Sequence, residues 1–230
     1  FIMIYSYSLI KNKNKKLCLV ILLFLNLFLI YHIVKLKSTR ENYISVSNKI
    51  LDTKDDVFYI RNFLSKNEHK LVINYTRNQH KNRNIKNHGF RLNMPLNNKK
   101  IYNIFYSKEK IKKIETIVKQ NTSKRLLKPN FPIEYRYYPK GSSGMKTHSD
   151  TILFNPPQYE VVYTIQNSSD SYTGWYSKDN KLTRIHTEPN SAIIIKAGSN
   201  RHYVSPVKEG DRSILKLIYS EIRIPIKKYS

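Results

Sequence analysis

The stretch MKTHSD, residues 145–150, belongs to a series of short strand-like segments that fill the second half of the chain. Gly, Pro, Asn and Ser separate these segments, which all follow Pro129. They are residues 133–138, 145–150, 159–166, 181–187, 191–196, 202–207 and 212–220. Several short strands with turn residues between them are typical of a β-sandwich or barrel. We therefore predict an all-β core after Pro129.

Helical patterns precede this core. The segment VFYIRNF (residues 57–63) predicts a strand, and SKNE (residues 65–68) forms a capping box for a helix that should end near Arg77. A second amphipathic helix is predicted over residues 107–120, and residues 78–100 are polar enough to predict a loop. The expected buried residues are Leu71, Val72 and Tyr75 on the first helix, and Ile111, Ile114, Ile117 and Val118 on the second. Two helices followed by strands indicate an α+β fold.

A hydrophobic segment lies near the start of the sequence. Residues 17–34, LCLVILLFLNLFLIYHIV, contain no formal charge and would span about 27 Å as a helix, enough for a bilayer core. We predict a single transmembrane anchor here, with a cleaved signal peptide or a buried core helix as the alternatives. The expected organisation is a basic tail over 1–16, the anchor over 17–34, a stalk over 35–54 and one domain over 55–230.

The composition restricts the function only weakly. The formal net charge of +25 is compatible with a nucleic-acid partner. However, the chain is rich in Lys, Asn, Ile and Tyr, which A/T-rich codons encode, so genome composition is an alternative source of the charge. Cys18 is the only cysteine, which excludes a disulfide within the chain.

Two pairs of a histidine and an acid stand two residues apart. Because successive strand residues alternate between faces, His148 and Asp150 would point the same way along a strand. His186 and Glu188 form a second such pair, but no suitable partners follow it, and we interpret it as structural. The first pair has a partner in His202, which follows a Gly-Ser-Asn turn and begins a new strand. Three other histidines lie in a helix or polar loop without a partner pattern: His69, His80 and His88.

The first pair together with His202 would supply two imidazoles and one carboxylate. On one face of a metal, this set leaves three positions open and suits the non-haem Fe(II) oxygenases. Arg212 lies ten residues after His202, at the head of the next apolar strand. Its planar guanidinium could hold the far carboxylate of a cosubstrate through two hydrogen bonds. Lys216 on the same strand is the alternative cation.

Three segments resemble one known family. VFYIRNFLSKNE (residues 57–68), YPKGSSGMKTHSD (138–150) and HYVSPVKEGDRSI (202–214) resemble the Fe(II)- and 2-oxoglutarate-dependent dioxygenases, on the side of the prolyl 4-hydroxylase alpha-subunit catalytic domain. The resemblance covers residues 57–220 and implies a double-stranded β-helix, or jelly-roll, core with flanking N-terminal helices. The Gly-Gly segment of most members is replaced here by YTGW at residues 172–175.

The resemblance also implies roles for individual residues. His148, Asp150 and His202 would be the iron ligands. Arg212 would hold the side-chain carboxylate of 2-oxoglutarate, with Tyr138 as a hydrogen-bond partner. Thr164 is a further candidate for that pocket.

The implied activity is the hydroxylation of a peptide or protein substrate, with prolyl residues as the leading target. Fe(II), 2-oxoglutarate and O₂ would take part, succinate and CO₂ would be the coproducts, and ascorbate is a candidate reductant. Together with the anchor, this predicts a single-pass protein of the endoplasmic reticulum or another secretory-pathway membrane, with a lumenal catalytic domain. One alternative is a nucleic-acid demethylase of the AlkB kind, although the second Arg of those enzymes corresponds to Ile218 here. The other alternative is a non-enzymatic β-barrel binding module with a vestigial metal site.

Overall fold

The computed structural model describes residues 25–31, 51–52, 57–81, 90–118 and 125–226. The chain divides into two compact units, Phe1–Asn48 and Lys49–Ser230. Within the first unit, residues 25–31 form a helix, while the rest of the predicted anchor lies outside the described residues. None of the described helices is both long and apolar enough to cross a membrane. The anchor over residues 17–34 therefore stays a prediction.

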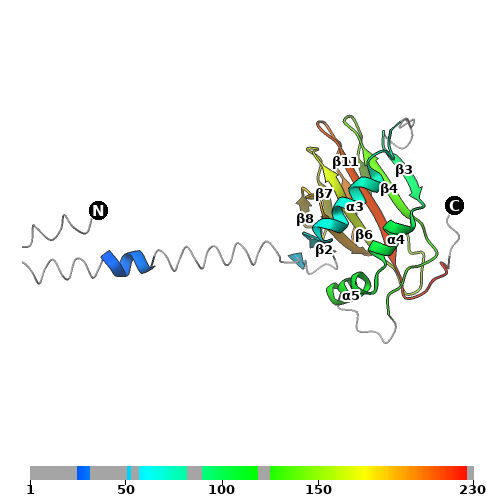
Figure 1. Ribbon diagram of the computed structural model, residues 1–230, viewed down its shortest axis with the longest axis horizontal. Coiled ribbons are helices and arrows are strands. Elements are labelled where there is room, and N and C mark those ends of the chain that lie inside the picture. Colours follow the sequence, from blue (N-terminus) through cyan, green and yellow to red (C-terminus); the bar gives the residue numbers. More distant parts are fainter. Residues whose placement is uncertain (1–24, 32–50, 53–56, 82–89, 119–124, 227–230) are drawn as a thin grey trace, which may run out of the picture. The chain divides into compact units, whose positions relative to one another are not determined.

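The second unit is built on two antiparallel sheets (Figure 1). The larger sheet has the strand order β1-β2-β9-β6-β11-β4-β3 and the smaller one the order β5-β10-β7-β8. The strands of the larger sheet are β1 (Leu51–Asp52), β2 (Val57–Ile60), β3 (Leu92–Leu96), β4 (Ile133–Tyr138), β6 (Tyr159–Asn167), β9 (Ser191–Lys196) and β11 (Arg212–Tyr219). Those of the smaller sheet are β5 (Met145–His148), β7 (Thr173–Tyr176), β8 (Leu182–Ile185) and β10 (His202–Val204). The predicted α+β class with a jelly-roll core is confirmed.

Three helices accompany the larger sheet: α3 (Lys66–Thr76), α4 (Lys99–Phe105) and α5 (Lys108–Ile117). Figure 1 shows α3 and α4 lying across one face of this sheet. The predicted capping box starts α3, because the Ser65 side chain accepts from the Glu68 backbone while the Glu68 side chain accepts from the Ser65 backbone. Val72 of α3 is fully buried in the main apolar core. The helices therefore cover the outer face of the sheet and leave its other face to the smaller sheet.

Strand alternation divides the larger sheet into two faces of different chemistry. On β6 and β11, Val161, Tyr163, Leu215 and Leu217 belong to the main apolar core with the helices. The residues between them point to the opposite, inner face, which the smaller sheet covers. This inner face carries the buried charged side chains of Glu134, Arg136, Glu160 and Arg212, together with Lys216, whose side chain is 14% exposed. The space between the sheets is therefore the polar interior of the molecule.

Several local predictions were wrong. The segment 78–100 contains β3 and the start of α4 instead of a continuous loop. The strand β3, LNMPL, lies at the edge of the larger sheet, where Pro95 is tolerated and a periodic apolar pattern is not required. Leu71 is 43% exposed, because the buried stripe of α3 runs through Val72 and Thr76 instead. The strand β7, which was not among the predicted strands, overlaps the YTGW segment, and its Gly174 leaves room for the ring of Tyr203.

Two histidines without a predicted partner contact tyrosines. The Nδ1 atom of His69 lies 2.6 Å from the Tyr163 hydroxyl, and that of His80 lies 3.0 Å from the Tyr135 hydroxyl. Both are therefore integrated into the packing around the larger sheet. His88 lies outside the described residues.

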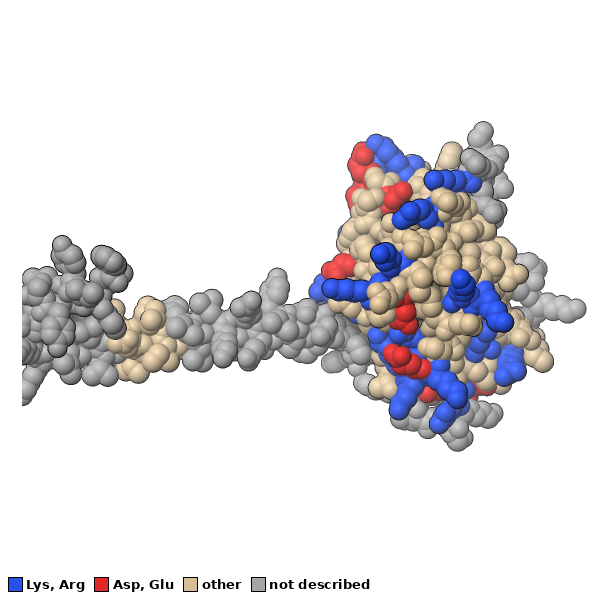
Figure 2. Space-filling view, viewed as in Figure 1, with Lys and Arg blue, Asp and Glu red and all other residues tan. Residues whose placement is uncertain are grey.

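The basic side chains are dispersed on the face of the molecule drawn in Figure 2. There the Lys and Arg side chains form several separate groups, with acidic and uncharged residues among them. A phosphate backbone is followed best by a continuous basic stripe. Over the described residues of this face, the high net charge does not produce such a stripe.

Candidate metal centre

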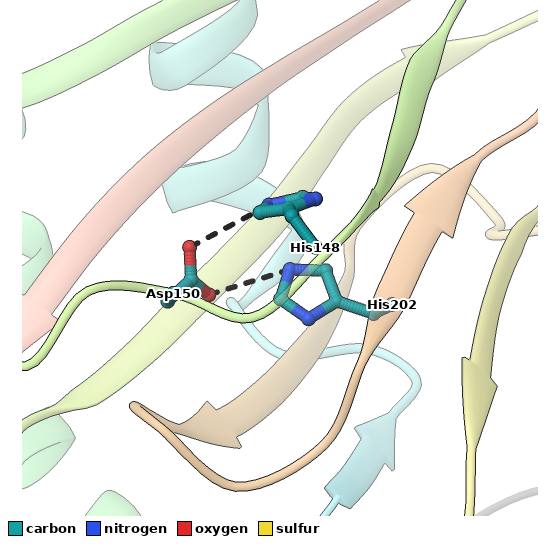
Figure 3. Close-up of side chains that lie close together, drawn as sticks. All are labelled: His148, Asp150 and His202. Atoms are coloured by element: carbon teal, nitrogen blue, oxygen red, sulfur yellow. Dashed lines mark ion pairs between the residues drawn. The ribbon is translucent and has the colours of Figure 1, made fainter. Parts of the chain in front are cut away.

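Strand pairing brings two distant histidines together. His148 ends β5 and His202 begins β10, and the two residues are direct partners in the antiparallel pair. Their rings tilt against each other with centroids 4.3 Å apart. Asp150 follows His148 by two residues and lies in the loop after β5, not within the strand as predicted. The predicted proximity of the three side chains is nevertheless observed (Figure 3).

The donor atoms of these residues converge. Nε2 of His202 lies 3.3 Å from Oδ2 of Asp150, and Nε2 of His148 lies 3.8 Å from Oδ1 of the same carboxylate. One donor atom from each residue lies within 4.8 Å of the others. In the part of the chain that the structure describes, this is the one group of three His, Cys, Asp or Glu residues that could hold a metal ion.

Both imidazoles are oriented by backbone carbonyls. Nδ1 of His148 lies 2.8 Å from the carbonyl oxygen of Lys146, and Nδ1 of His202 lies 3.1 Å from that of Asn200. A carbonyl only accepts, so each Nδ1 carries a proton, and each ring directs its Nε2 atom to the centre. Nε2 of His148 is buried without a hydrogen-bond partner. A metal ion would satisfy this orphaned acceptor, so the residues present fit a divalent metal such as Fe(II).

The charge states also suit metal ligation. Burial lowers the pKa of His202, although the nearby Asp150 opposes this, so the ring remains neutral and able to coordinate. Burial would raise the pKa of Asp150, but the charge of Lys216 and its hydrogen bond outweigh this effect and lower the pKa to about 2. Asp150 is therefore an ionised carboxylate throughout the physiological range.

Lys216 is a partner of this carboxylate that the sequence prediction named only as an alternative cosubstrate anchor. Its Nζ donates to Oδ1 of Asp150 at 2.8 Å and also contacts Oε2 of Glu160. Burial together with the charge of Asp150 raises the pKa of Glu160 to about 7, against the opposing effect of Lys216. The centre is thus embedded in a buried network of charges.

A narrow cavity between the two sheets leads to the centre. Its wall contains the three candidate ligands and both charged and apolar residues of the inner face. The lining residues are Arg136, Tyr138, Met145, His148, Asp150, Val162, Thr173, Ile193, Ile195, His202, Val204, Ile214 and Lys216. A larger surface groove of about 730 Å³ lies elsewhere, beside α4 and Lys128, and no His, Cys or acidic residue lines it.

Arg212 lies behind the cavity wall as a buried cation. Its side chain is fully buried, and Nη1 donates to Oγ1 of Thr173 at 3.0 Å. Its Nε and Nη2 atoms have no hydrogen-bond partner among the described residues. Burial accordingly lowers its pKa. A buried guanidinium with two unused donors is a natural anchor for a carboxylate of a ligand.

The remaining predicted pocket residues lie nearby. Tyr138 is the β4 partner of Arg212 across the β11–β4 pair, and it is buried against the same cavity. Thr164 shares the inner face of β6 with Val162, and its Oγ1 is buried without a hydrogen-bond partner. Trp175, which the sequence prediction did not single out, pairs with His202 and also has an unpartnered Nε1. Like Arg212, Thr164 and Trp175 therefore each have a buried polar atom without a hydrogen-bond partner among the described residues.

The second histidine–acid pair has a structural environment. Nε2 of His186 lies 2.7 Å from the carbonyl oxygen of Ser169, and Glu188 forms an ion pair with Arg61 at 3.1 Å. Neither residue belongs to the converging group described above. The two pairs therefore have different surroundings, and only the first converges with a further histidine, His202.

Comparisons with known proteins give matches only at the level of structure. No protein-family model and no curated protein matches the sequence. Among solved structures, an oxidoreductase of the 2OG-Fe(II) oxygenase family from Burkholderia pseudomallei aligns with a TM-score of 0.58 and 13% identity, over 74% of this chain and 86% of that one. This chain has the fold of the 2-oxoglutarate- and Fe(II)-dependent oxygenases.

Prolyl hydroxylases are among the solved structures with the same fold, and two of them illustrate the match. One, from Trichoplax adhaerens, is in complex with a peptide fragment of the hypoxia inducible factor oxygen degradation domain, and it aligns with a TM-score of 0.55 and 14% identity over 80% of this chain and 93% of that one. The other is the viral collagen prolyl hydroxylase of Paramecium bursaria Chlorella virus-1 as a 2-oxoglutarate complex, with a TM-score of 0.53 and 14% identity over 72% of this chain and 96% of that one. The resemblance predicted from the motifs is confirmed at the level of the oxygenase fold.

Proposed function

We propose that this chain is an Fe(II)- and 2-oxoglutarate-dependent dioxygenase that hydroxylates a peptide substrate, with prolyl residues as the leading target. One observation carries the proposal. The inner face of the barrel contains a converging His148–Asp150–His202 group, and the buried guanidinium of Arg212 nearby has two unused donors. Together these would hold a metal ion and the far carboxylate of a dicarboxylate cosubstrate.

The residues of the candidate site would have separate roles. His148, Asp150 and His202 would hold the metal, and Arg212 with Tyr138 would orient the distal carboxylate of 2-oxoglutarate. The apolar wall that includes Val162, Ile193 and Ile214 would exclude water. When bound, Fe(II) with 2-oxoglutarate and O₂ supplies the oxidising power for hydroxylation, with succinate and CO₂ as coproducts. Ascorbate is the proposed reductant that maintains the ferrous state.

A peptide substrate is favoured over a nucleic acid. The solved prolyl hydroxylases with this fold include one bound to a peptide fragment. In the demethylase alternative, a second arginine would be expected at the position of Ile218. Here Ile218 is buried in an apolar cluster with Phe131, Leu153 and Phe154. Its surroundings favour packing over ligand binding.

The charge-free segment over residues 17–34 supports a membrane location. We include in the proposal that this segment anchors the chain in the endoplasmic reticulum or another secretory-pathway membrane, with the catalytic domain in the lumen. A lumenal domain would meet secreted polypeptides, which are suitable prolyl substrates.

The test is a turnover assay with the full chain, Fe(II), ascorbate and 2-oxoglutarate. Proline-rich peptides, lysine-containing peptides and methylated oligonucleotides would be supplied in parallel, and succinate and the modified substrate would be measured. We expect succinate formation to be stimulated by a proline-rich peptide and to be lost in His148→Ala. Stimulation by methylated oligonucleotides alone would favour the demethylase. No succinate under any condition, with no metal binding, would support the non-enzymatic module.

A further inference from the structure

A buried lysine occupies one oxygen of the candidate aspartate ligand. Nζ of Lys216 lies 2.8 Å from Oδ1 of Asp150 and contacts Glu160 on its other side. The side chains of Lys216, Asp150 and Glu160 are only 14%, 8% and 3% exposed. Desolvating such charges is expensive, and a buried ion pair is often no more stable than an apolar replacement. Stability alone is therefore a poor explanation for these three residues.

We propose that Lys216 is a positioning residue that makes Asp150 a one-oxygen metal ligand. This inference rests on the proposed function. Oδ1 of Asp150 is engaged by the ammonium group, whereas Oδ2 faces Nε2 of His202 at 3.3 Å. The approach of His148 to the oxygen that Lys216 holds is longer, at 3.8 Å. A carboxylate held through one oxygen can offer only the other to a metal, which preserves the open positions that a cosubstrate needs.

The ammonium group is itself fixed by a chain of contacts. Glu160 on β6 contacts Lys216, and Nε2 of Gln158 donates to Oε1 of Glu160 at 3.2 Å. The same amide group donates to the carbonyl oxygen of Thr151 at 2.8 Å, while its Oε1 accepts from the backbone of Leu153 at 3.0 Å. The chain of contacts therefore returns to the loop that carries Asp150. Side chain and backbone of the ligand are held by one connected network, which we call the Lys216 clamp.

The clamp separates the roles of two cations on β11. Arg212 and Lys216 both point to the inner face, four residues apart on one strand. Lys216 already contacts two carboxylates, while Arg212 retains two donors without a partner among the described residues. Lys216 is thus committed to the metal ligand, and Arg212 is available to the cosubstrate.

A paired double variant isolates the positioning effect. Lys216→Met alone would leave Glu160 without its lysine partner beside the metal site and would change the electrostatic attraction for a cation. Lys216→Met/Glu160→Gln replaces the lysine and this carboxylate together, so no carboxylate is left behind at position 160. The matched control is Lys110→Met/Glu68→Gln, because Nζ of Lys110 and Oε2 of Glu68 form another ion pair at 3.1 Å, with side chains 5% and 27% exposed. Neither residue lines the cavity between the two sheets.

The experiment titrates metal-free full-length protein with Co(II), an air-stable probe for the Fe(II) site. Affinity and the visible spectrum of the bound ion are recorded for wild type and both double variants. We expect the clamp variant to bind about 10- to 100-fold more weakly, as for other residues that orient a metal ligand. Its spectrum should also change, because Asp150 would be free to coordinate through both oxygens. The control variant should keep the wild-type affinity and spectrum.

Thermal unfolding of each metal-free variant reports whether the fold is intact. If the clamp variant does not fold, Lys216→Arg provides the same test, because it keeps the charge but replaces the compact ammonium with a wider fork. Wild-type affinity together with a wild-type spectrum in the folded clamp variant, or in Lys216→Arg, would overturn the positioning role and leave the proposed function standing. If the wild-type protein itself binds neither Co(II) nor Fe(II), the proposed function fails and the positioning role fails with it.

Discussion

Replacing Arg212 by methionine should remove cosubstrate binding without removing the metal site. Arg212 is fully buried, and it contacts Thr173 through one nitrogen while Nε and Nη2 lack hydrogen-bond partners among the described residues. None of its described contacts reaches the candidate metal ligands. Methionine fills a similar volume without a charge, so the variant tests the guanidinium group and not the space it occupies.

The expected magnitude follows from the burial of this group. Truncating one partner of a buried, hydrogen-bonded charge pair typically costs roughly 2–5 kcal/mol of binding free energy. That range corresponds to a loss of about 30-fold to several thousand-fold in affinity for 2-oxoglutarate. The protein without ligand should behave differently. Because the guanidinium is buried without a counter-charge, Arg212→Met should leave the melting temperature unchanged or raise it.

The assay is a titration of the Fe(II)-loaded protein with 2-oxoglutarate under anaerobic conditions, followed through the metal-to-ligand absorption band. Arg212→Lys keeps a positive charge but loses the planar guanidinium group, so its affinity for 2-oxoglutarate should lie between those of wild type and Arg212→Met. Arg184→Met removes an exposed arginine and controls for the change in net charge. Equal affinities for 2-oxoglutarate in all four proteins would refute the anchor role and would require another cation for the cosubstrate.

Three further predictions test other parts of the interpretation. His148→Ala should abolish metal binding and 2-oxoglutarate turnover, whereas His186→Ala should retain both. The opposite result would show that His186, and not His148, is the metal ligand. The full chain should pellet with membranes and resist carbonate extraction, and deletion of residues 17–34 should release it; extraction of the full chain by carbonate would contradict the anchor. Burial lowers the pKa of both His69 and His202, so the stability that their neutral forms provide is present above the unfolded pKa of about 6.5 and is lost as the pH falls through the folded values. From pH 7 to pH 5 the free energy of unfolding, measured in urea without metal, should therefore lose less, or gain more, in His69→Gln than in wild type, while the raised pKa of Glu160 acts in the opposite direction in both proteins; an equal change in wild type and variant would exclude the contribution of His69.

The strands that were predicted correctly combine a strong local signal with a central position. IEYRYY and SAIIIK coincide with β4 and β9, because their apolar and aromatic residues are favoured in strands and both strands are hydrogen-bonded on two sides. The missed strands have weaker local signals. The edge strand β3 contains a proline, and β7 contains Gly174 under the ring of Tyr203, so their positions depend on tertiary contacts.

The candidate metal ligands could be predicted from two features of the sequence. His148 and Asp150 stand two residues apart, and His202 begins a segment with a recognisable pattern through Arg212. The partner of the ligand could not be found in this way. Lys216 reaches Asp150 across 66 positions of sequence, and no local pattern encodes that contact. The alternation of β11 nevertheless places Lys216 on the same face as Arg212, and this was the available signal.

The charges within the strands do not lie where a sheet with one exposed face would place them. In an antiparallel sheet with one face in water, alternating polar residues are expected to point to solvent. Glu134 and Arg136 on β4 and Glu160 on β6 follow that alternation, yet all three are buried. The reason is the smaller sheet, which covers the second face and is assembled from segments scattered between residues 145 and 204. Polar alternation in a strand that is covered on both faces therefore indicates an internal site, and Arg212 is the member of this polar face whose described contacts leave two donors for a ligand.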